Sequence, residues 1–202
     1  MKLYCTPGSP YARMARIMVI EKGLEDRVEV TFAQTRKRGS PYYEINPSGR
    51  VPYLVRSDGV GMEESQVICA YLDQLDGKPA FEHQGWETRR LESLARSLLD
   101  GLTVWLRELY RPESERSPGV IRHEIDRAAR MVELWEREIG HPLMHGALNM
   151  AQLTLACALG LEARNPDFDW RSGHARLCDW YGPIAARPSF AATASPGASA
   201  NR

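Results

Sequence analysis

The chain has 202 residues, of which 43% are hydrophobic and 26% are charged, a composition typical of a soluble globular protein with one or two domains. Lys and Arg together number 26, and Asp and Glu together also number 26, so the formal net charge is zero. A general binder of nucleic acids or of anionic membranes needs a positive excess, so neither class is expected.

The first residues enter strand-like sequence directly, with no apolar signal segment, and no run in the chain is long enough to span a bilayer. The four cysteines show neither a Cys-x-x-Cys pair nor the spacing of metal ligands. They are Cys5, Cys69, Cys157 and Cys178. We therefore expect a reduced, cytoplasmic protein that binds neither a membrane nor a metal.

Strands and helices alternate over residues 1–77. We expect a strand at 2–5, a helix at 10–22, a strand at 28–32, a hairpin of strands at 53–56 and 60–62, and a helix at 66–75. Pro10 at the first helical position and Gly23 after the last one support the first helix, and Ser65 is the expected cap of the second. The order β-α-β, an irregular link, then β-β-α resembles the thioredoxin-like arrangement.

The chain changes character near residue 78. Residues 78–86 are rich in Gly, Pro and polar residues and are expected to form a linker. Helical spacing of apolar residues then predicts helices at 87–110, 120–139, 150–163 and 175–186, within a helical domain at 87–190. Pro183 predicts a kink or break in the last helix. The low-complexity residues 191–202 are expected to be a loosely held tail.

The start of the third of these helices is expected to be capped without a carboxylate. Asn149 is a favourable N-cap residue, and Gln152 stands three positions later, where its side chain can reach back to the Asn149 N–H. We interpret this pair as structural.

The most informative stretch is Asn46-Pro-Ser-Gly-Arg-Val-Pro-Tyr-Leu54, which is followed by Glu64-Ser65. Pro52 lacks an N–H and stands where a strand is about to begin, which is a poor way to build an ordinary strand. An X-Pro bond is the one place where a cis peptide is cheap. We therefore predict a cis bond at Val51–Pro52, which would turn the backbone N–H and C=O of Val51 toward a ligand.

Together with Ser9-Pro10-Tyr11 and with residues 186–190, these motifs resemble the cytosolic, bacterial-like glutathione S-transferases over residues 1 to about 190. The resemblance implies a thioredoxin-like domain at 1–77 followed by an all-helical domain at 87–190. It also implies a cytoplasmic homodimer, with the first domain of one chain against the second domain of the other. Glutathione would be the co-substrate, with no other cofactor, and an electrophilic, apolar small molecule would be its acceptor in a detoxification reaction.

The resemblance implies that Ser9 keeps the glutathione thiol ionised. Lowering a thiol pKa from ~8.5 to ~6.5 requires about 2.7 kcal/mol of preferential thiolate stabilisation. A hydrogen bond to a charged group contributes roughly 1.5–3 kcal/mol, and a helix N-terminus adds about 0.3–2 kcal/mol. Ser9, at the start of the first helix, can supply both. The alternative is that Ser9 is only an N-cap, a common role for Ser before Pro.

Other residues are expected to bind the remainder of the tripeptide. The backbone at Val51-Pro52 would pair with the cysteinyl main chain of glutathione, like a short added strand. Ser65 at a helix start would bind the γ-glutamyl carboxylate, and Glu64 would meet the γ-glutamyl ammonium. Arg50 would hold the glycyl end.

Two other functions stay open. Cys5, at the end of the first strand, could make the protein a glutathione-dependent thiol or peroxide reductase, although it precedes the helix start by too far to be activated there. Alternatively, the chain could be a non-enzymatic glutathione-binding scaffold. For a transferase, the apolar acceptor site is expected between the domains, with Tyr11, Trp105 and Leu109 as candidates, although a Leu/Trp stripe is more often core.

Overall fold

The computed structural model describes residues 1–81 and 85–194, and these divide into two compact units. The first unit comprises residues 1–81 together with 188–194, and the second comprises residues 85–187. Each unit has its own buried apolar core and is described separately.

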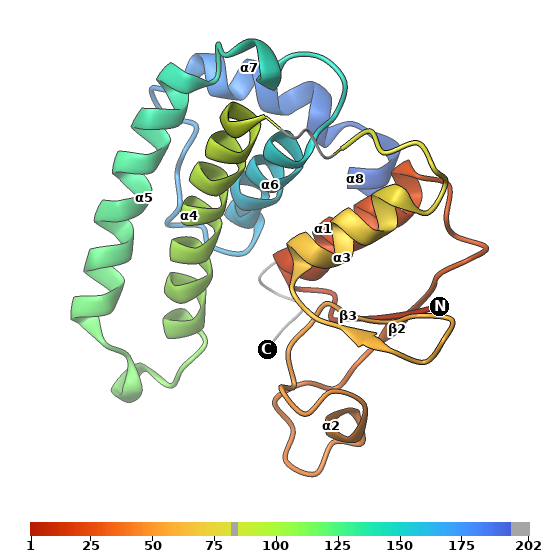
Figure 1. Ribbon diagram of the computed structural model, residues 1–202. Coiled ribbons are helices and arrows are strands. Elements are labelled where there is room, and N and C mark those ends of the chain that lie inside the picture. Colours follow the sequence, from red (N-terminus) through yellow and green to blue (C-terminus); the bar gives the residue numbers. More distant parts are fainter. Residues whose placement is uncertain (82–84, 195–202) are drawn as a thin grey trace. The chain divides into compact units, whose positions relative to one another are not determined.

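The first unit is built on a four-stranded mixed sheet (Figure 1). Its elements are β1 (Lys2–Cys5), α1 (Pro10–Glu21), β2 (Glu29–Phe32), α2 (Tyr42–Ile45), β3 (Tyr53–Val55), β4 (Gly61–Met62), α3 (Ser65–Gln74) and α8 (Pro188–Ala192). The strand order is β2-β1-β3-β4, with β1 parallel to β2 and antiparallel to β3, and β3 antiparallel to β4. This confirms the predicted thioredoxin-like fold of the N-terminal part; the four-residue helix α2 lies in the stretch expected to be an irregular link.

Two helices, α1 and α3, lie side by side and pack against each other over the sheet (Figure 1). The sequence places apolar residues on more than one face of α1, and eight of its residues are buried, including Met14, Ile17 and Met18. In α3 the residues that face inward are Ile68 and Leu72, at helical spacing. Burial on two sides explains why apolar residues occupy more than one face of α1.

An ionic cluster holds the chain that follows α3. The Asp73 carboxylate is fully buried and accepts hydrogen bonds from the backbone N–H groups of Ala80 and Phe81 at 2.9–3.1 Å. The Lys22 ammonium lies 3.2 Å from Asp73 and 2.9 Å from Asp76. Residues 78–81, expected to be part of a linker, are therefore fastened to the first unit.

Residues 188–194 also belong to the first unit, although the sequence suggested a helical domain up to residue 190 and a loose tail after it. Phe190 and Thr193 are each only 1% exposed, because they pack onto α1. The alanines at 191, 192 and 194 make this stretch look like low-complexity sequence, but side chains this small also allow the segment to pack closely against α1. The rest of the expected tail, residues 195–202, lies outside the described residues.

The second unit is all-helical, as predicted. Its helices are α4 (Trp86–Leu109), α5 (Pro118–Glu138), α6 (Met150–Leu159) and α7 (Ala175–Ala185), with 3₁₀ turns at Glu113–Glu115, Pro142–Met144 and Gly160–Ala163. All ten residues of α6 are buried, and this helix packs along α4, which also packs along α5 (Figure 1). Pro183 does not break α7, which continues to Ala185. Among the helices of the described part, none is long and apolar enough to cross a membrane.

The start of α6 differs from the expected capping arrangement in the partner of the Gln152 side chain. The Asn149 side-chain oxygen accepts hydrogen bonds from the N–H groups of Ala151 and Gln152 at 3.0 and 3.1 Å, as expected of an N-cap. The Gln152 side-chain amide, however, donates to the Leu143 carbonyl at 3.2 Å, and the Asn149 amide donates to the same oxygen at 2.7 Å. The pair therefore also fastens the loop before α6.

Candidate functional site

The strand register brings three separate segments to one edge of the sheet. Tyr4 near the end of β1 is opposite Tyr53 at the start of β3, and Leu54 is opposite Met62 at the end of β4. Segment 6–9 follows β1, segment 51–52 precedes β3, and segment 63–65 follows β4, so all three meet the sheet at this edge. The sequence-predicted residues Ser9, Arg50, Val51, Pro52, Glu64 and Ser65 lie in or directly beside these segments.

Ser9 is the N-cap of α1. Its backbone is extended, with φ −80° and ψ 118°, and its hydroxyl oxygen accepts a hydrogen bond from the Ala12 N–H at 3.2 Å. Pro10 occupies the first helical position, where its missing N–H costs nothing. A hydroxyl has two acceptor lone pairs and one proton to donate. Capping therefore uses an acceptor position of Ser9 and leaves its proton to donate to an anion.

The loop before β3 is held by the side chains of Tyr42 and Asn46, whose role the sequence alone did not indicate. The Val51–Pro52 peptide bond is cis, as predicted. The carbonyl of Arg50 accepts hydrogen bonds from the Tyr42 hydroxyl at 2.5 Å and from the Asn46 side-chain amide at 3.1 Å. Burial raises the pKa of Tyr42 to about 12, so its hydroxyl stays a donor at neutral pH. Tyr42 in α2 and Asn46 directly after it therefore hold this loop in position.

The start of α3 has an unusual backbone at Glu64, with φ 67° and ψ 121°. A positive φ is uncommon for a residue other than glycine, and such conformations concentrate at functional sites. Glu64, and not Ser65 as expected, is the N-cap residue of α3, and its side chain makes no hydrogen bond to the first turn of this helix. Ser65 is the first helical residue and is 2% exposed. The next residue back, Glu63, accepts a hydrogen bond from the Ser48 hydroxyl.

Arg50 and Glu64 are brought together at this edge of the sheet. Arg50 Nη1 lies 3.8 Å from Glu64 Oε1, and the two side chains are 80% and 67% exposed. An ion pair so exposed contributes little to stability. Both groups are thus accessible to a charged ligand.

Cys5 lies in the core of the first unit, whereas a reactive thiol needs to be accessible. Its side chain is completely buried, and this burial raises the pKa of Cys5 to about 12, although the charge of Arg16 opposes the shift. The thiolate is the nucleophilic form of cysteine, so a buried thiol with a raised pKa is inert at neutral pH. Cys69 and Cys157 are also buried, and Cys178 is half-buried.

The three candidates for an acceptor site lie on two helices. Tyr11 is half-buried in the first turn of α1. Trp105 and Leu109 are on α4, where Trp105 is 2% exposed and its ring packs edge-on against Phe168, with 6.4 Å between the ring centroids. Trp105 is therefore a core residue of the second unit.

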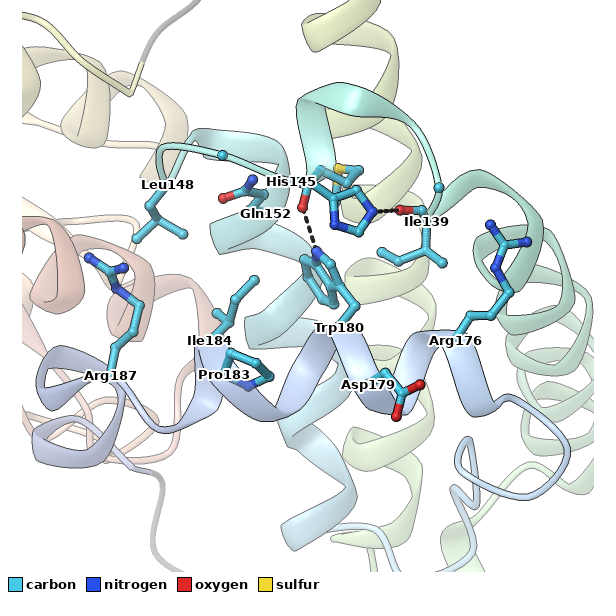
Figure 2. Close-up of a pocket in the computed structure, with 13 residues that line it drawn as sticks. Ile139, His145, Leu148, Gln152, Arg176, Asp179, Trp180, Pro183, Ile184 and Arg187 are labelled. Carbon is cyan, nitrogen blue, oxygen red and sulfur yellow. Dashed lines mark hydrogen bonds between the residues drawn. The ribbon is translucent and has the colours of Figure 1, made fainter.

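A pocket of about 440 Å³ lies in the second unit, and none of the sequence-predicted site residues lines it (Figure 2). It is formed between α7 and the loop that joins α5 to α6. The Trp180 indole N–H donates to the Met144 carbonyl at 2.7 Å, and the His145 ring donates to the Ile139 carbonyl at the same distance. These polar groups fasten the loop over α7.

The arrangement of potential metal ligands in the described part of the chain does not indicate a metal centre. Over residues 1–81 and 85–194, no group of three or more His, Cys, Asp or Glu side chains is arranged to hold a metal ion.

Comparison with known proteins identifies the class. The sequence model of the family described as glutathione S-transferase, N-terminal domain, matches residues 8–75. A glutathione transferase family member from Pseudomonas fluorescens Pf-5, solved with bound S-(propanoic acid)-glutathione, is 32% identical, with a TM-score of 0.85, and the alignment covers 97% of this chain and 100% of that one. The chain therefore belongs to the glutathione S-transferase family.

Two further relatives match over the same length. A glutathione S-transferase from Methylobacillus flagellatus KT, solved with glutathione bound, is 27% identical, with a TM-score of 0.86, over 96% of this chain and 99% of that one. The GST-like protein YibF of Escherichia coli K12 is 27% identical over 204 residues, which cover 98% of this chain and 100% of the relative. The likeness thus includes the helical unit as well as the residues matched by the family model.

Proposed function

We propose that this chain binds glutathione at the edge of the sheet described above and that Ser9 stabilises its thiolate for attack on an electrophilic, apolar small molecule. The observation that carries the proposal is the convergence, through the strand register, of Ser9, the Val51–Pro52 loop and the start of α3. The relatives solved with glutathione or a glutathione conjugate support it.

The chemistry follows from the charge of the ligand. Glutathione carries two carboxylates and, when reactive, a thiolate. The N-terminal ends of α1 and α3 both face this sheet edge, and a helix N-terminus carries a partial positive charge of about half an elementary charge. Ser9 would donate its hydroxyl proton to the sulfur, while its oxygen keeps the Ala12 cap bond that fixes its position.

The rest of the tripeptide would be held by the neighbouring segments. We assign the γ-glutamyl carboxylate to Ser65 and the start of α3, the γ-glutamyl ammonium to Glu64, and the glycyl carboxylate to Arg50. The backbone of Val51 would pair with the cysteinyl main chain, as an added strand pairs with a sheet edge. The exposed Arg50–Glu64 pair would then exchange its mutual contact for contacts with the two ends of the ligand.

The reductase alternative through Cys5 has little support, because burial raises the pKa of Cys5 and leaves its sulfur inaccessible. The scaffold alternative differs from the proposal only in lacking turnover.

We also propose a homodimer, because closed two-fold pairing is the commonest arrangement of soluble oligomers. A monomeric mass by light scattering at micromolar concentration would contradict the dimer.

The test measures binding and turnover together. The protein should be retained on immobilised glutathione, be eluted by free glutathione, and conjugate glutathione to a small aromatic electrophile. Ser9→Ala should lose most turnover and keep most retention, whereas Cys5→Ala should keep both. Retention without turnover in the unmodified protein would favour the scaffold, and loss of turnover only in Cys5→Ala would favour the reductase.

A further inference from the structure

A buried arginine connects the first turn of α1 to the C-terminal segment of the first unit. Arg13 is only 8% exposed. Its Nη2 donates to the Phe190 carbonyl at 3.0 Å, its Nε donates to the Thr193 hydroxyl oxygen at 3.4 Å, and its guanidinium lies 5.5 Å from the centre of the Phe190 ring. The partners are separated from Arg13 by about 180 residues of chain, so the contact depends on the folded unit.

The segment that receives Arg13 is itself ordered by internal contacts. The Thr193 hydroxyl donates to the Ser189 carbonyl at 2.7 Å and accepts from Arg13, so its donor and an acceptor position are both used. Phe190 and Thr193 are 1% exposed. At the other end of α1, the Ser189 hydroxyl donates to Glu21. Residues 189–193 are thus attached to both ends of α1.

Arg13 stands one helical turn after Ser9, and the Arg13 N–H donates to the Ser9 carbonyl at 2.9 Å, which is the first main-chain bond of the helix. The first turn of a helix is the part most prone to fraying, because few of its N–H groups have partners within the helix. Here the turn is held on one side by the Ser9 cap and on the other by the Arg13 guanidinium.

We propose that Arg13 is a positioning residue for Ser9 and that Phe190 and Thr193 are its anchor, so that the C-terminal segment acts as part of the thiolate site. This inference rests on the proposed function. A hydrogen bond to a thiolate requires the Ser9 oxygen to be held within a few tenths of an ångström, and the groups that lock it determine how much of the bond is realised. Arg13 acts through the backbone of the first turn and has no assigned contact with glutathione.

Three variants separate this role from a general effect of charge or stability. Arg13→Lys keeps the positive charge but loses the planar fork that reaches both Phe190 and Thr193. Thr193→Val removes the hydroxyl that accepts from Arg13 and donates to the Ser189 carbonyl, and it leaves Arg13 in place. Arg27→Lys is a control for the loss of a guanidinium-to-carbonyl contact at an exposed position, because Arg27 Nη1 donates to the Leu75 carbonyl at 3.1 Å within the same unit.

Two readouts are needed. The pH dependence of the bound-glutathione thiolate absorbance and of kcat/KM should shift upward in Arg13→Lys by about half to one pH unit, which lowers kcat/KM about threefold to tenfold near neutral pH. Thr193→Val should shift it in the same direction by less, and Arg27→Lys should not shift it. Hydrogen exchange of the Ala12 and Arg13 amides, measured without glutathione, should be about tenfold faster in Arg13→Lys.

The outcomes distinguish the inference from the proposed function. If Ser9→Ala raises the thiol pKa while Arg13→Lys and Thr193→Val leave both readouts unchanged, the positioning role is wrong and the proposed function stands. If Ser9→Ala has no effect on turnover, the proposed role of Ser9 is wrong whatever the exchange data show. Should Arg13→Lys fail to fold, Thr193→Val alone decides, because it removes one hydroxyl and leaves Arg13 in place.

Discussion

The hydroxyl oxygen of Ser9 accepts a hydrogen bond from the Ala12 N–H at 3.2 Å, and this bond both caps α1 and fixes the oxygen at the edge of the sheet. The same local arrangement occurs at the start of α5, where Ser117 precedes Pro118 and accepts from the Val120 N–H at 3.4 Å. The Ser9 cap follows β1, whose end pairs with the start of β3 next to the loop at residues 46–52, whereas Ser117 belongs to the second unit. The pair of caps therefore lets a structural role be separated from a catalytic one.

Ser9→Ala should reduce turnover with a small aromatic electrophile about tenfold or more near neutral pH. It removes a charge-assisted hydrogen bond worth roughly 1.5–3 kcal/mol, which raises the pKa of bound glutathione by about one to two units. Activity should recover in part at higher pH, and glutathione affinity should change less. Ser9→Ala and Ser117→Ala should each lower the free energy of unfolding by ~1 kcal/mol, the usual loss of an N-cap, but Ser117→Ala should leave turnover unchanged. Full activity and an unchanged pH profile in Ser9→Ala would mean that Ser9 is only a cap.

Cys5 should contribute a measurable pH dependence to stability. Its pKa in the folded chain is raised to about 12 by burial, from an ordinary value of 9.0. The folded state therefore holds the thiol proton more tightly than the unfolded state does, so this contribution is complete below pH 9 and is lost as the pH rises toward 12. Urea denaturation should show a steeper loss of stability over this window in the unmodified chain than in Cys5→Ala. Parallel pH profiles for the two proteins would show that Cys5 ionises normally.

The order of elements could be predicted because each has a local signal. Pro10 and Gly23 delimit α1, and the spacing of apolar residues locates α4 and α5 closely. The cis bond at Val51–Pro52 was predictable because a proline there cannot serve an ordinary strand. In contrast, α2 has four residues, which is too short for periodicity to reveal.

The sequence could locate the candidate residues relative to the predicted strands and helices, but it could not give their geometry. The positive φ of Glu64 is a property that only the folded loop imposes, because an isolated Glu disfavours it. The roles of Tyr42 and Asn46 depend on one carbonyl, that of Arg50, eight and four residues away. Thr193 is buried and accepts a hydrogen bond from Arg13 near the other end of the chain, and a contact between residues so far apart cannot be predicted from the local composition.

Asp73→Asn should destabilise the first unit by about 3 kcal/mol, since it removes the buried partner of the Lys22 ammonium and leaves that charge paired with the partly exposed Asp76 alone. Asp73 also loses acceptor capacity for the N–H groups of Ala80 and Phe81. Burial disfavours the charged form of Lys22, but its hydrogen bonds to Asp76 and Asp73 outweigh this and hold its pKa above the ordinary value. Asp76→Asn, at a partly exposed carboxylate, should cost less when both are compared by urea denaturation. Equal losses would show that the buried carboxylate has no special role.

Glu64→Gln should weaken the binding of glutathione about tenfold, because it removes the charge that we assign to the γ-glutamyl ammonium. The loss is expected at the low end of the range for charge-assisted hydrogen bonds, roughly 1.5 kcal/mol, since the Glu64 side chain is 67% exposed. Gln keeps the length of the side chain, so the unusual backbone at this position is disturbed little.

A ligand change provides the sharper test of the same contact. A glutathione analogue that lacks the γ-glutamyl amine should bind the unmodified protein about as weakly as glutathione binds Glu64→Gln, and the substitution should not weaken the analogue further. Calorimetric titration of both ligands against both proteins measures this coupling directly. Equal losses for glutathione and the analogue would show that Glu64 acts by shaping the start of α3 or by holding Arg50, and that the ammonium is bound elsewhere.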